Sequence, residues 1–591
     1  MQNAANAQST PQQQLLRQRL SWVAIGMIVL AILLLFRVVW FQFPQPPRVV
    51  AEFALQREAN AGSTELIESP RGRIYDRSGN PLAVNTIQYR VFISPNIIAD
   101  IGQTASDLAR ILNRDELEMF NLLRNSTNPS EFLGVVDADA WQQIRDLNLL
   151  AIRMDRIQQR VYPQGALGAQ VIGFVNGTGE DARGNYGVEG YYQAQLAGQV
   201  VEQEVSNIPF ELPEDFSIIE GGADLVLTID RDVQFLAESE LQRAITETGA
   251  TRGTIIVMNP RNGDVLAMAS YPTFDPNAFF DVSNPDLLGN PAIGNVYEPG
   301  SVFKVLTVAA GLETGAISPD WTYNDQAMLE IGGVQIWNWD RQARGLVDTR
   351  RILVDSLNVG AANIALSMEE EQFYGMLNRF GIGTPTRIDL QGEEGGIMRT
   401  PTDITGEWSP SDLATNSFGQ GLSVTPLQML TAVNAIANDG LIMQPRVVYQ
   451  IIDGEQIITS DPTVLRRAVS SETAQIVRDM MVAVVEGDVD ARARVPGYTV
   501  AGKTGTAEIA SPIGYERDAW IMSFVGFFPA DDPQVSVLVK LDRPTSGRWA
   551  SEVAAPVFSR LASRLAILLE IPTDEVRQAL QEEGVPVGEQ Q

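Results

Sequence analysis

Ser301 and Lys304 have the types and the spacing that could support catalysis. Ser301 directly precedes residues 302–312, an apolar stretch that predicts a helix ended at Gly315. Because residues three apart are neighbours on a helix surface, the Lys304 amine can reach the Ser301 hydroxyl. The helix start offers backbone N–H groups to a developing oxyanion, and apolar surroundings would lower the pKa of Lys304 toward that of a general base. Taken alone, the pair also fits a Ser that caps a helix beside a surface Lys.

The composition leaves few other catalytic groups. The chain has 591 residues, with no His and no Cys. These absences exclude a Ser-His-Asp triad, a thiolate nucleophile, a disulfide and any metal site built on His or Cys. An activated Ser therefore needs another base, and Lys is the main candidate. The net charge of −30 argues against nucleic acid as a partner, since such a chain repels phosphates. We expect no cofactor.

A second motif, Ser356-Leu357-Asn358, follows an apolar stretch. It offers a hydroxyl and a carboxamide that could hold a Lys and a substrate amide. The alternative interpretation is an ordinary helix cap.

A third motif, Lys503-Thr504-Gly505-Thr506, follows residues 498–502, which read as a strand. Gly505 would allow the backbone of a ligand to approach closely, and the Lys and Thr side chains could bind a carboxylate. The alternative is an edge strand protected by a Lys. Each motif is weak alone, but the ordered set Ser-x-x-Lys, Ser-x-Asn and Lys-Thr-Gly is a strong constellation for acyl transfer.

With these motifs the chain closely resembles the class B penicillin-binding proteins, which are membrane-anchored peptidoglycan D,D-transpeptidases. Further resemblance lies in residues 71–79, 160–163 and 187–190, which are similar to signatures of the family's non-catalytic pedestal domain, and in residues 418–428. Serine β-lactamases lack a pedestal. The class A proteins carry a glycosyltransferase domain whose signature uses a His, so this chain does not resemble them.

The resemblance implies a role for each motif residue. Ser301 would attack the D-Ala-D-Ala peptide of a donor stem, and Lys304 would take its proton. Ser356 would relay a proton to the leaving amine, while Asn358 would orient Lys304 and the substrate. Lys503 would supply positive potential.

Two further features follow from the same resemblance. Thr504 and Thr506, on either side of Gly505, would bind the donor's terminal carboxylate, and the backbone N–H groups of Ser301 and Thr506 would form the oxyanion hole. Leu357 departs from the polar or small residues frequent at the middle of the second motif, but its side chain need not face the site.

The N-terminal region predicts a membrane anchor. Residues 22–41 are apolar except for Arg37, and at 1.5 Å per residue they would span about 30 Å, the thickness of the hydrocarbon core. The residues after this run do not resemble a signal-peptide cleavage site. Arg17 and Arg19 precede it and favour a cytoplasmic N-terminus. The rest of the chain would then lie outside the cytoplasm.

The remaining pattern predicts a multidomain α+β fold. Residues 74–82 read as a hairpin, and residues 104–113 and 115–123 as helices. Residues 253–270 and 520–541 read as hairpins at the two ends of the second region, with mainly helical patterns between them and a closing helix at 553–569. This arrangement predicts an antiparallel sheet flanked by helices, of the penicillin-binding and serine β-lactamase type.

We therefore expect five segments: a cytoplasmic tail (1–20), a transmembrane anchor (21–43), an elongated α+β pedestal (48–222), a transpeptidase domain (224–570) and a frayed acidic tail (571–591). The expected partners are peptidoglycan stem peptides, β-lactams, a polytopic membrane glycosyltransferase and other cell-wall synthesis proteins. The alternative function is a catalytically silent scaffold or a β-lactam sensor with the same fold. A role in elongation or in division is not readable from the sequence.

Overall fold

A computed structural model describes residues 11–42, 63–178, 181–198, 200–205, 221–403, 407–487, 492–511 and 514–582. The chain divides into two compact units, Met1–Ile67 with Val200–Ile218, and Glu68–Gln199 with Ile219–Gln591. In the first unit, helix α1 (Pro11–Gln42) is followed by strand β1 (Ser63–Glu68), which pairs with β8 (Val200–Val205).

None of the described helices combines the length and the hydropathy that a membrane crossing requires. The predicted anchor, residues 21–43, extends past the described residues at its C-terminal end, and the predicted tail, residues 1–20, begins before them. The anchor stays a prediction.

A five-stranded antiparallel sheet forms the centre of the second unit, in the order β11-β10-β22-β21-β20. Its strands are β10 (Arg252–Met258), β11 (Val265–Tyr271), β20 (Ala501–Ser511), β21 (Gly514–Phe528) and β22 (Val535–Asp542). The two hairpins predicted at the ends of this region are both present, and they meet where β10 pairs with β22. The predicted antiparallel sheet is confirmed.

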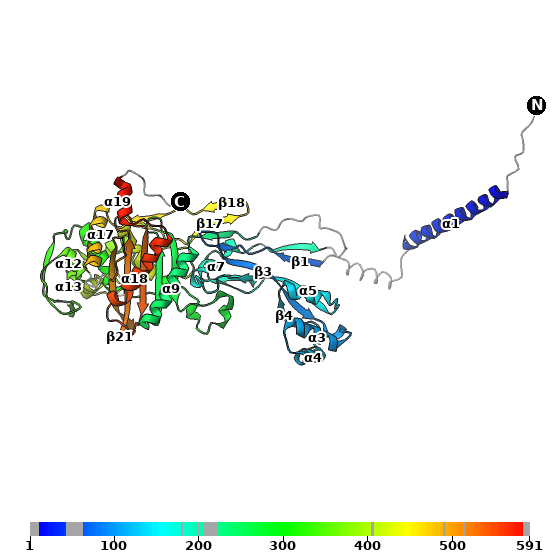
Figure 1. Cartoon of the computed structure of the whole chain (residues 1–591), viewed down its shortest axis with the longest axis horizontal. Helices are drawn as coiled ribbons and strands as arrows, with labels where there is room; N and C mark the ends of the chain where they lie inside the picture. The colour runs from blue at the N-terminus through cyan, green and yellow to red at the C-terminus, as the bar shows by residue number, and fades with distance from the viewer. Residues whose placement is uncertain are drawn as a thin grey trace, which may run out of the picture. The chain divides into compact units, whose positions relative to one another are not determined.

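Helices cover both faces of this sheet, because its strands are apolar on both sides. Ile255 and Val257 of β10 join the core with helices α9 (Arg231–Thr248) and α18 (Ala550–Leu568), seen against the sheet in Figure 1. Ile256 and Met258 point to the opposite face and pack with helices that include α11 (Lys304–Glu313), α13 (Asn358–Ser367) and α16 (Pro426–Ala437). Helix α11 is buried along nearly its whole length, as a central helix must be.

The pedestal is built on a second sheet. Its order is β18-β17-β9-β2-β3-β4, with β5 beside β3. The strands are β2 (Ile74–Tyr75), β3 (Pro81–Ile93), β4 (Glu131–Val136), β5 (Ile152–Val161), β9 (Asp224–Leu227), β17 (Val448–Asp453) and β18 (Gln456–Thr459). The predicted β2–β3 hairpin is present, and the Asp76 carboxylate closes its turn by accepting the N–H groups of Ser78 and Asn80.

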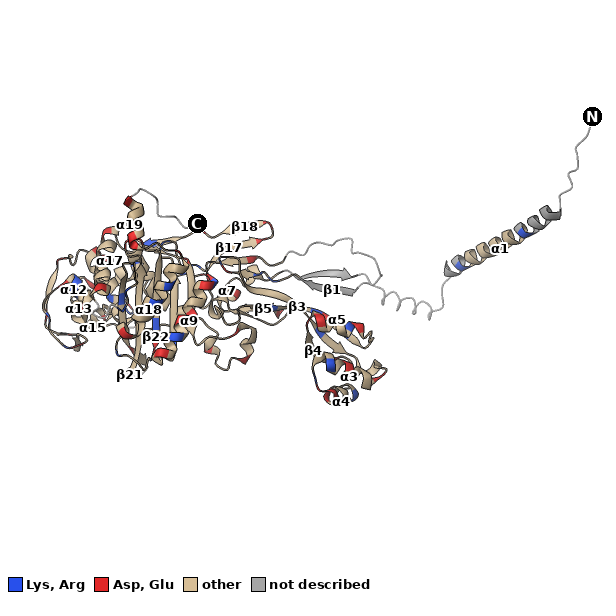
Figure 2. Cartoon of the chain, viewed as in Figure 1, with Lys and Arg blue, Asp and Glu red and all other residues tan. Residues whose placement is uncertain are grey.

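The helices α3 (Ile101–Leu112), α4 (Glu116–Asn125) and α5 (Ala138–Asp146) pack with β3, β4 and β5 around a small core of their own. The first two confirm the helices predicted at residues 104–113 and 115–123. Figure 2 shows basic and acidic residues interspersed on them, and Arg114 pairs with Glu118 one helical turn away.

The pedestal sheet and the catalytic region share strands and a core. Strands β9, β17 and β18 follow residue 222 in the chain, yet β9 pairs in parallel with β2. One hydrophobic core contains both Ile74 of β2 and the side chains of α11. The Tyr192 hydroxyl donates to Asp389 at 2.9 Å, and that carboxylate also accepts the N–H of Val448 at 2.8 Å.

Two expectations from the sequence need correction. Residues 571–591 were expected to fray, but helix α19 (Asp574–Glu582) is formed. The reason is Arg577, which is buried and donates to the carboxylates of Asp531 and Asp574. The region between the two hairpins is less uniformly helical than predicted, since it also contains short strands such as β12 (Thr322–Asp325) and β14 (Val334–Trp337).

Candidate active site

Ser301 lies in a short 3₁₀ turn, η5 (Gly300–Phe303), that leads directly into α11. Gly300 has a φ of +58°, and a side chain there would meet the carbonyl oxygen of Thr506 at 2.9 Å. Gly is required by both the conformation and the space. The turn that carries Ser301 is therefore held directly against the third motif.

The segment 418–421 supports this turn from another side. Gly300 donates its N–H to the carbonyl of Gly419 at 3.0 Å, and a side chain at Gly419 would meet the Gly300 carbonyl at 2.3 Å. The segment's Gly421 also donates its N–H to Glu298 at 3.1 Å. Its glycines thus allow the chain to pack tightly behind Ser301.

The amine of Lys304 joins the first motif to the second. Lys304 Nζ lies 3.0 Å from Ser301 Oγ, 2.6 Å from the carbonyl oxygen of Ser356, 3.2 Å from Ser356 Oγ and 2.7 Å from Asn358 Oδ1. The Asn358 amide is fixed in this orientation because its Nδ2 donates to the carbonyl of Trp337 at 2.9 Å. The structure brings together the four residues predicted from the first two motifs.

Burial changes the proton affinity of both lysines. Lys304 is fully buried, and desolvation, helped by the nearby charge of Lys503, holds its pKa well below the usual value. Desolvation also lowers the pKa of Lys503 to about 8. A lowered pKa makes the neutral amine, which can accept a proton, easier to form, so the site favours Lys304 as a base.

Ser356 is placed by the end of helix α12 (Thr349–Val354). Leu357 donates its N–H to Ile352 at 3.0 Å and Ser356 donates to Leu353 at 3.3 Å, which is the bonding pattern of a Schellman cap. Ser356 takes the left-handed position of that cap, with a φ of +53°, where Gly is usual. The second motif is therefore a helix cap and also part of the site.

The same cap explains why Leu357 stands at the middle of the motif. In a Schellman cap the residue after the left-handed one makes an apolar contact with the last turn of the helix. Leu357 and Ile352 are both fully buried in the same core. The Leu357 side chain is thus part of the hydrophobic core, which agrees with the expectation that it need not face the site.

The third motif lies within β20, the edge strand of the five-stranded sheet, rather than after a strand. Lys503 is buried, and its Nζ lies 3.1 Å from Ser356 Oγ and 3.2 Å from the carbonyl of Thr504. Thr504 and Thr506 are half-buried, and Thr506 Oγ1 accepts the N–H of Ala550 at 3.3 Å. Ser356 Oγ is thus within reach of both lysine amines.

Gly505 also serves the packing of the protein itself. A side chain at this position would meet Val302 at 2.7 Å and the carbonyl oxygen of Pro299 at 2.8 Å. The segment that carries Ser301 therefore approaches Gly505 closely. Its absent side chain lets the first motif pack against the third.

Three neighbouring residues that the sequence did not single out contact Asn358 or the two residues that flank the second motif. Trp337 accepts from Asn358 through its carbonyl, Asn338 accepts the Val359 N–H at 3.1 Å through its side chain, and the Trp339 indole donates to the Asp355 carbonyl at 3.0 Å. The only feature of the sequence that could have indicated these three residues is the unusual Trp-Asn-Trp tripeptide, which belongs to none of the three motifs.

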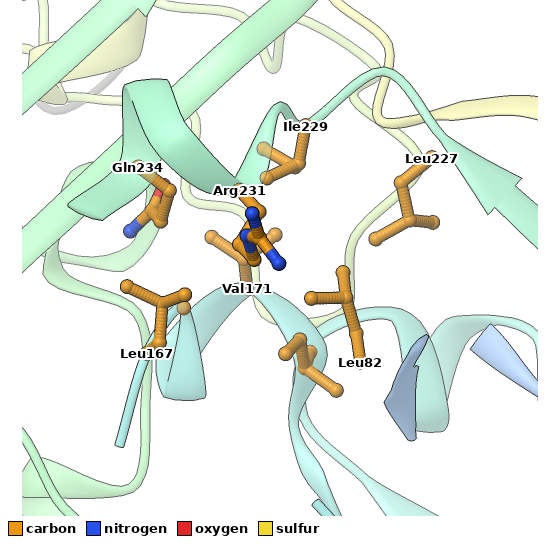
Figure 3. A pocket seen from close by; sticks show the side chains of 9 residues that line it. Leu82, Leu167, Val171, Leu227, Ile229, Arg231 and Gln234 are labelled. Carbon is orange, nitrogen blue, oxygen red and sulfur yellow. The ribbon is translucent and has the colours of Figure 1, made fainter. Parts of the chain in front are cut away.

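Other sites offer little chemistry. A small pocket shown in Figure 3 is lined mainly by apolar side chains around Arg231 and Gln234, and it contains none of the predicted catalytic residues. Within the described residues there is no acidic cluster that could hold a metal ion. The three motifs therefore form the best candidate active site.

Two family models match the chain. The penicillin-binding protein transpeptidase domain matches residues 253–563, and the penicillin-binding protein dimerisation domain matches residues 66–207. The first includes all three motifs.

Relatives match along most of their length. The chain is 31% identical to stage V sporulation protein D of Bacillus subtilis, over 92% of this chain and 85% of that protein. It is 30% identical to the peptidoglycan D,D-transpeptidase FtsI of Escherichia coli, over 97% and 96%. Among solved structures, penicillin-binding protein 3 of Mycobacterium tuberculosis in complex with aztreonam is 29% identical, with a TM-score of 0.66 over 86% of this chain and 98% of that one.

Proposed function

The chain belongs to the class B penicillin-binding proteins, and we propose that Ser301 is the nucleophile of its reaction. It is a peptidoglycan D,D-transpeptidase of cell-wall synthesis and binds β-lactams. The observation that carries the assignment of Ser301 is the 3.0 Å contact between its hydroxyl and the amine of the fully buried Lys304.

The contacts of Lys304 support its role as the base. A neutral amine has two hydrogens and one lone pair. The carbonyl oxygens of Ser356 and Asn358 can only accept, and at 2.6 and 2.7 Å they take the two hydrogens. The lone pair is then left for the third close neighbour, the Ser301 hydroxyl. This arrangement favours transfer of the Ser301 proton to Lys304.

The reaction then follows as two acyl transfers. Ser301 Oγ bonds to the carbonyl carbon of the donor D-Ala-D-Ala peptide, the C–N bond breaks, and D-Ala leaves with a proton that Lys304 passes through the Ser356 hydroxyl. The amine of an acceptor stem attacks the resulting ester. The peptide cross-link forms, and the proton of that amine returns to Ser301 Oγ.

The third motif is assigned to the donor's negative charges. Lys503 supplies positive potential beside Ser356, and the half-buried Thr504 and Thr506 bind the terminal carboxylate next to Gly505. The backbone N–H groups of Ser301 and Thr506 form the oxyanion hole. The close approach of Gly300 to Thr506 supports this pairing of two segments.

The experiment that tests this assignment is acylation by a β-lactam. Intact-mass analysis with peptide mapping should find one adduct, on Ser301, that persists for many minutes to hours, because no residue is assigned to activate water for hydrolysis. Ser301→Ala is the control. Labelling that survives in this variant would refute the nucleophile, and rapid turnover of the drug would refute the transpeptidase mechanism.

We propose a single-pass location in the cytoplasmic membrane, with residues 21–43 as the anchor, the N-terminus in the cytoplasm and residues 48–222 and 224–570 as extracytoplasmic pedestal and transpeptidase domains. The apolar run 22–41 and the preceding arginines support this topology. A polytopic membrane glycosyltransferase would be the partner. Co-purification from membranes tests the partner, and release of the chain by salt without detergent would contradict the anchor.

A further inference from the structure

Residues 337–339, which we call the brace, hydrogen-bond to Asn358 of the second motif and to the two residues that flank the motif, Asp355 and Val359. The Trp337 carbonyl accepts from Asn358 at 2.9 Å, and the Asn338 side chain accepts from Val359 at 3.1 Å. The Trp339 indole N–H donates to Asp355, the residue before Ser356, at 3.0 Å. The brace, which begins at the end of strand β14, thus contacts the chain on both sides of Ser356.

The brace is itself firmly anchored. Asn338 is buried, and its amide donates to both carboxylate oxygens of Asp325 at 3.0 Å. Asp325 is also buried, and it accepts the Tyr323 hydroxyl at 3.1 Å and the Arg344 N–H at 2.9 Å. Because the buried Asp325 carboxylate accepts this many hydrogen bonds, it is held in place, and it restrains Asn338 and the brace in turn.

Trp339 also reaches the other side of the site. Its ring meets that of Trp549 edge-to-face, with centroids 5.2 Å apart and an interplanar angle of 72°. Trp549 directly precedes α18, whose first residue, Ala550, donates its N–H to Thr506 Oγ1. One indole therefore contacts the residue before the second motif through a hydrogen bond, and the segment beside the third motif through its ring.

Packing alone does not account for Trp339. Its side chain is 52% exposed, so it adds little to the core. Its one polar group bonds to a carbonyl at the end of α12, in a turn whose next residue, Ser356, is a non-glycine in the left-handed region. Such a backbone persists only where its surroundings hold it.

We propose that Trp339 is a positioning residue, which holds the Asp355–Ser356 turn so that the Ser356 hydroxyl stays between Lys304 and Lys503. The inference rests on the proposed function, because the proton relay is what needs this hydroxyl in place. Trp339 acts through the Asp355 carbonyl and touches no reacting atom. The edge-to-face contact with Trp549 fixes the plane of the Trp339 indole, and therefore the direction in which its N–H group points.

Trp339→Phe tests the proposal in the full-length protein, because it keeps an aromatic ring against Trp549 and removes the N–H. Acylation by a fluorescent penicillin is followed by stopped flow, which separates the binding constant of the drug from the rate constant of acylation. We expect the rate constant to fall about five- to tenfold, the loss typical of one hydrogen bond, with the binding constant unchanged. Partial unfolding would lower the amplitude of labelling and not this rate constant.

Trp408→Phe is the matched control, because the Trp408 indole also donates one hydrogen bond, to Tyr374 at 2.7 Å, and neither residue belongs to the three motifs. Its acylation rate constant should stay within about twofold of the parent. The proposal is overturned if Trp339→Phe acylates at the parent rate, or if only its binding constant for the drug is weakened. It is also overturned if the acylation rate constants of the two variants fall by the same factor. Labelling that persists in Ser301→Ala would instead overturn the proposed function.

Discussion

The Ser356 hydroxyl lies between the two amines of the site, 3.2 Å from Lys304 Nζ and 3.1 Å from Lys503 Nζ. The two lysines share its oxygen and differ in their other partners. Lys304 also reaches Ser301, whereas Lys503 reaches the Thr504 carbonyl. The proposed chemistry needs a neutral Lys304 and a charged Lys503 beside the same hydroxyl. The rate of acylation should therefore depend on pH in a specific way.

We expect a bell-shaped pH profile for acylation. The rate should rise with pH as Lys304 loses its proton, in a range well below that of an ordinary Lys because burial lowers its pKa. It should fall again as Lys503, whose pKa burial lowers to about 8, loses its charge. Lys503→Arg keeps the charge at high pH and should move the alkaline limb upward. An alkaline limb that stays in place would show that another group causes it.

Lys304→Ala should slow acylation more than Lys503→Ala at neutral pH. Loss of a general base lowers a rate by about 10²–10⁴-fold, whereas loss of an electrostatic contact is partly covered by Thr504 and Thr506. Second-order acylation rates of the two variants measure this difference. If the penalties are equal, or larger at Lys503, the base has been assigned to the wrong residue.

The end of helix α12 shows how an element stabilises its own active-site residue. A non-glycine in the left-handed region costs about 1–3 kcal/mol, and at Ser356 the cap's apolar contact helps to offset it. Leu357→Ala removes that contact and should lower the free energy of unfolding by about 2–5 kcal/mol in urea titrations. The same change at Leu366, which is 39% exposed on α13, should have an effect within about 0.5 kcal/mol. Equal effects of the two substitutions would contradict the role of Leu357.

The elements that the sequence predicts well are those whose signals are local. The 253–270 hairpin combines apolar strands with an Asn-Pro-Arg-Asn-Gly turn, so both its strands and its pairing could be predicted. The first motif was predicted for the same reason, since Ser301 and Lys304 lie within one helical turn.

Contacts between distant segments could not be predicted from such signals. Nothing in the sequence of β17 indicates that this strand pairs with β9 of the pedestal sheet. Gly300, Gly419 and Gly505 each leave room for another segment, and only the folded chain shows which one. The bond from Trp339 to Asp355 joins two loops by tertiary packing alone, so the brace carried no motif.

At the scale of the whole molecule, the second unit should not need residues before 49 in order to fold. It has its own sheets and cores, and the pedestal contributes Ile74 and Leu82 to the same core as α11. A variant that begins at residue 49 should remain in solution without detergent and bind penicillin at Ser301. Aggregation of this variant, or failure to label, would show that residues before 49 contribute to the fold.

Glu189 is the polar centre that joins the pedestal's segments. It is fully buried, and its carboxylate accepts from Arg160 at 2.7 Å and from Arg71 at 2.8 Å. Burial alone would raise the pKa of Glu189, but the two guanidinium groups outweigh it and hold the pKa below its usual value. The cluster of Glu189 and its two arginines therefore contributes its full stability at pH values above the ordinary pKa of a Glu. This stability is lost as the pH falls through the lowered pKa of Glu189.

Glu189→Gln leaves two guanidinium groups without their carboxylate and should lower the free energy of unfolding by about 3–5 kcal/mol at neutral pH. Asp155→Asn is the matched control, because Asp155 pairs with Arg153 at the surface of the same pedestal and should contribute less than about 1 kcal/mol.

Since one core runs from β2 to α11, the loss of penicillin labelling on heating should follow the same single transition as the far-ultraviolet signal, and both should shift together in Glu189→Gln. A pedestal transition that shifts while labelling survives to the parent temperature would show that the two regions unfold independently and that Glu189 stabilises the pedestal alone.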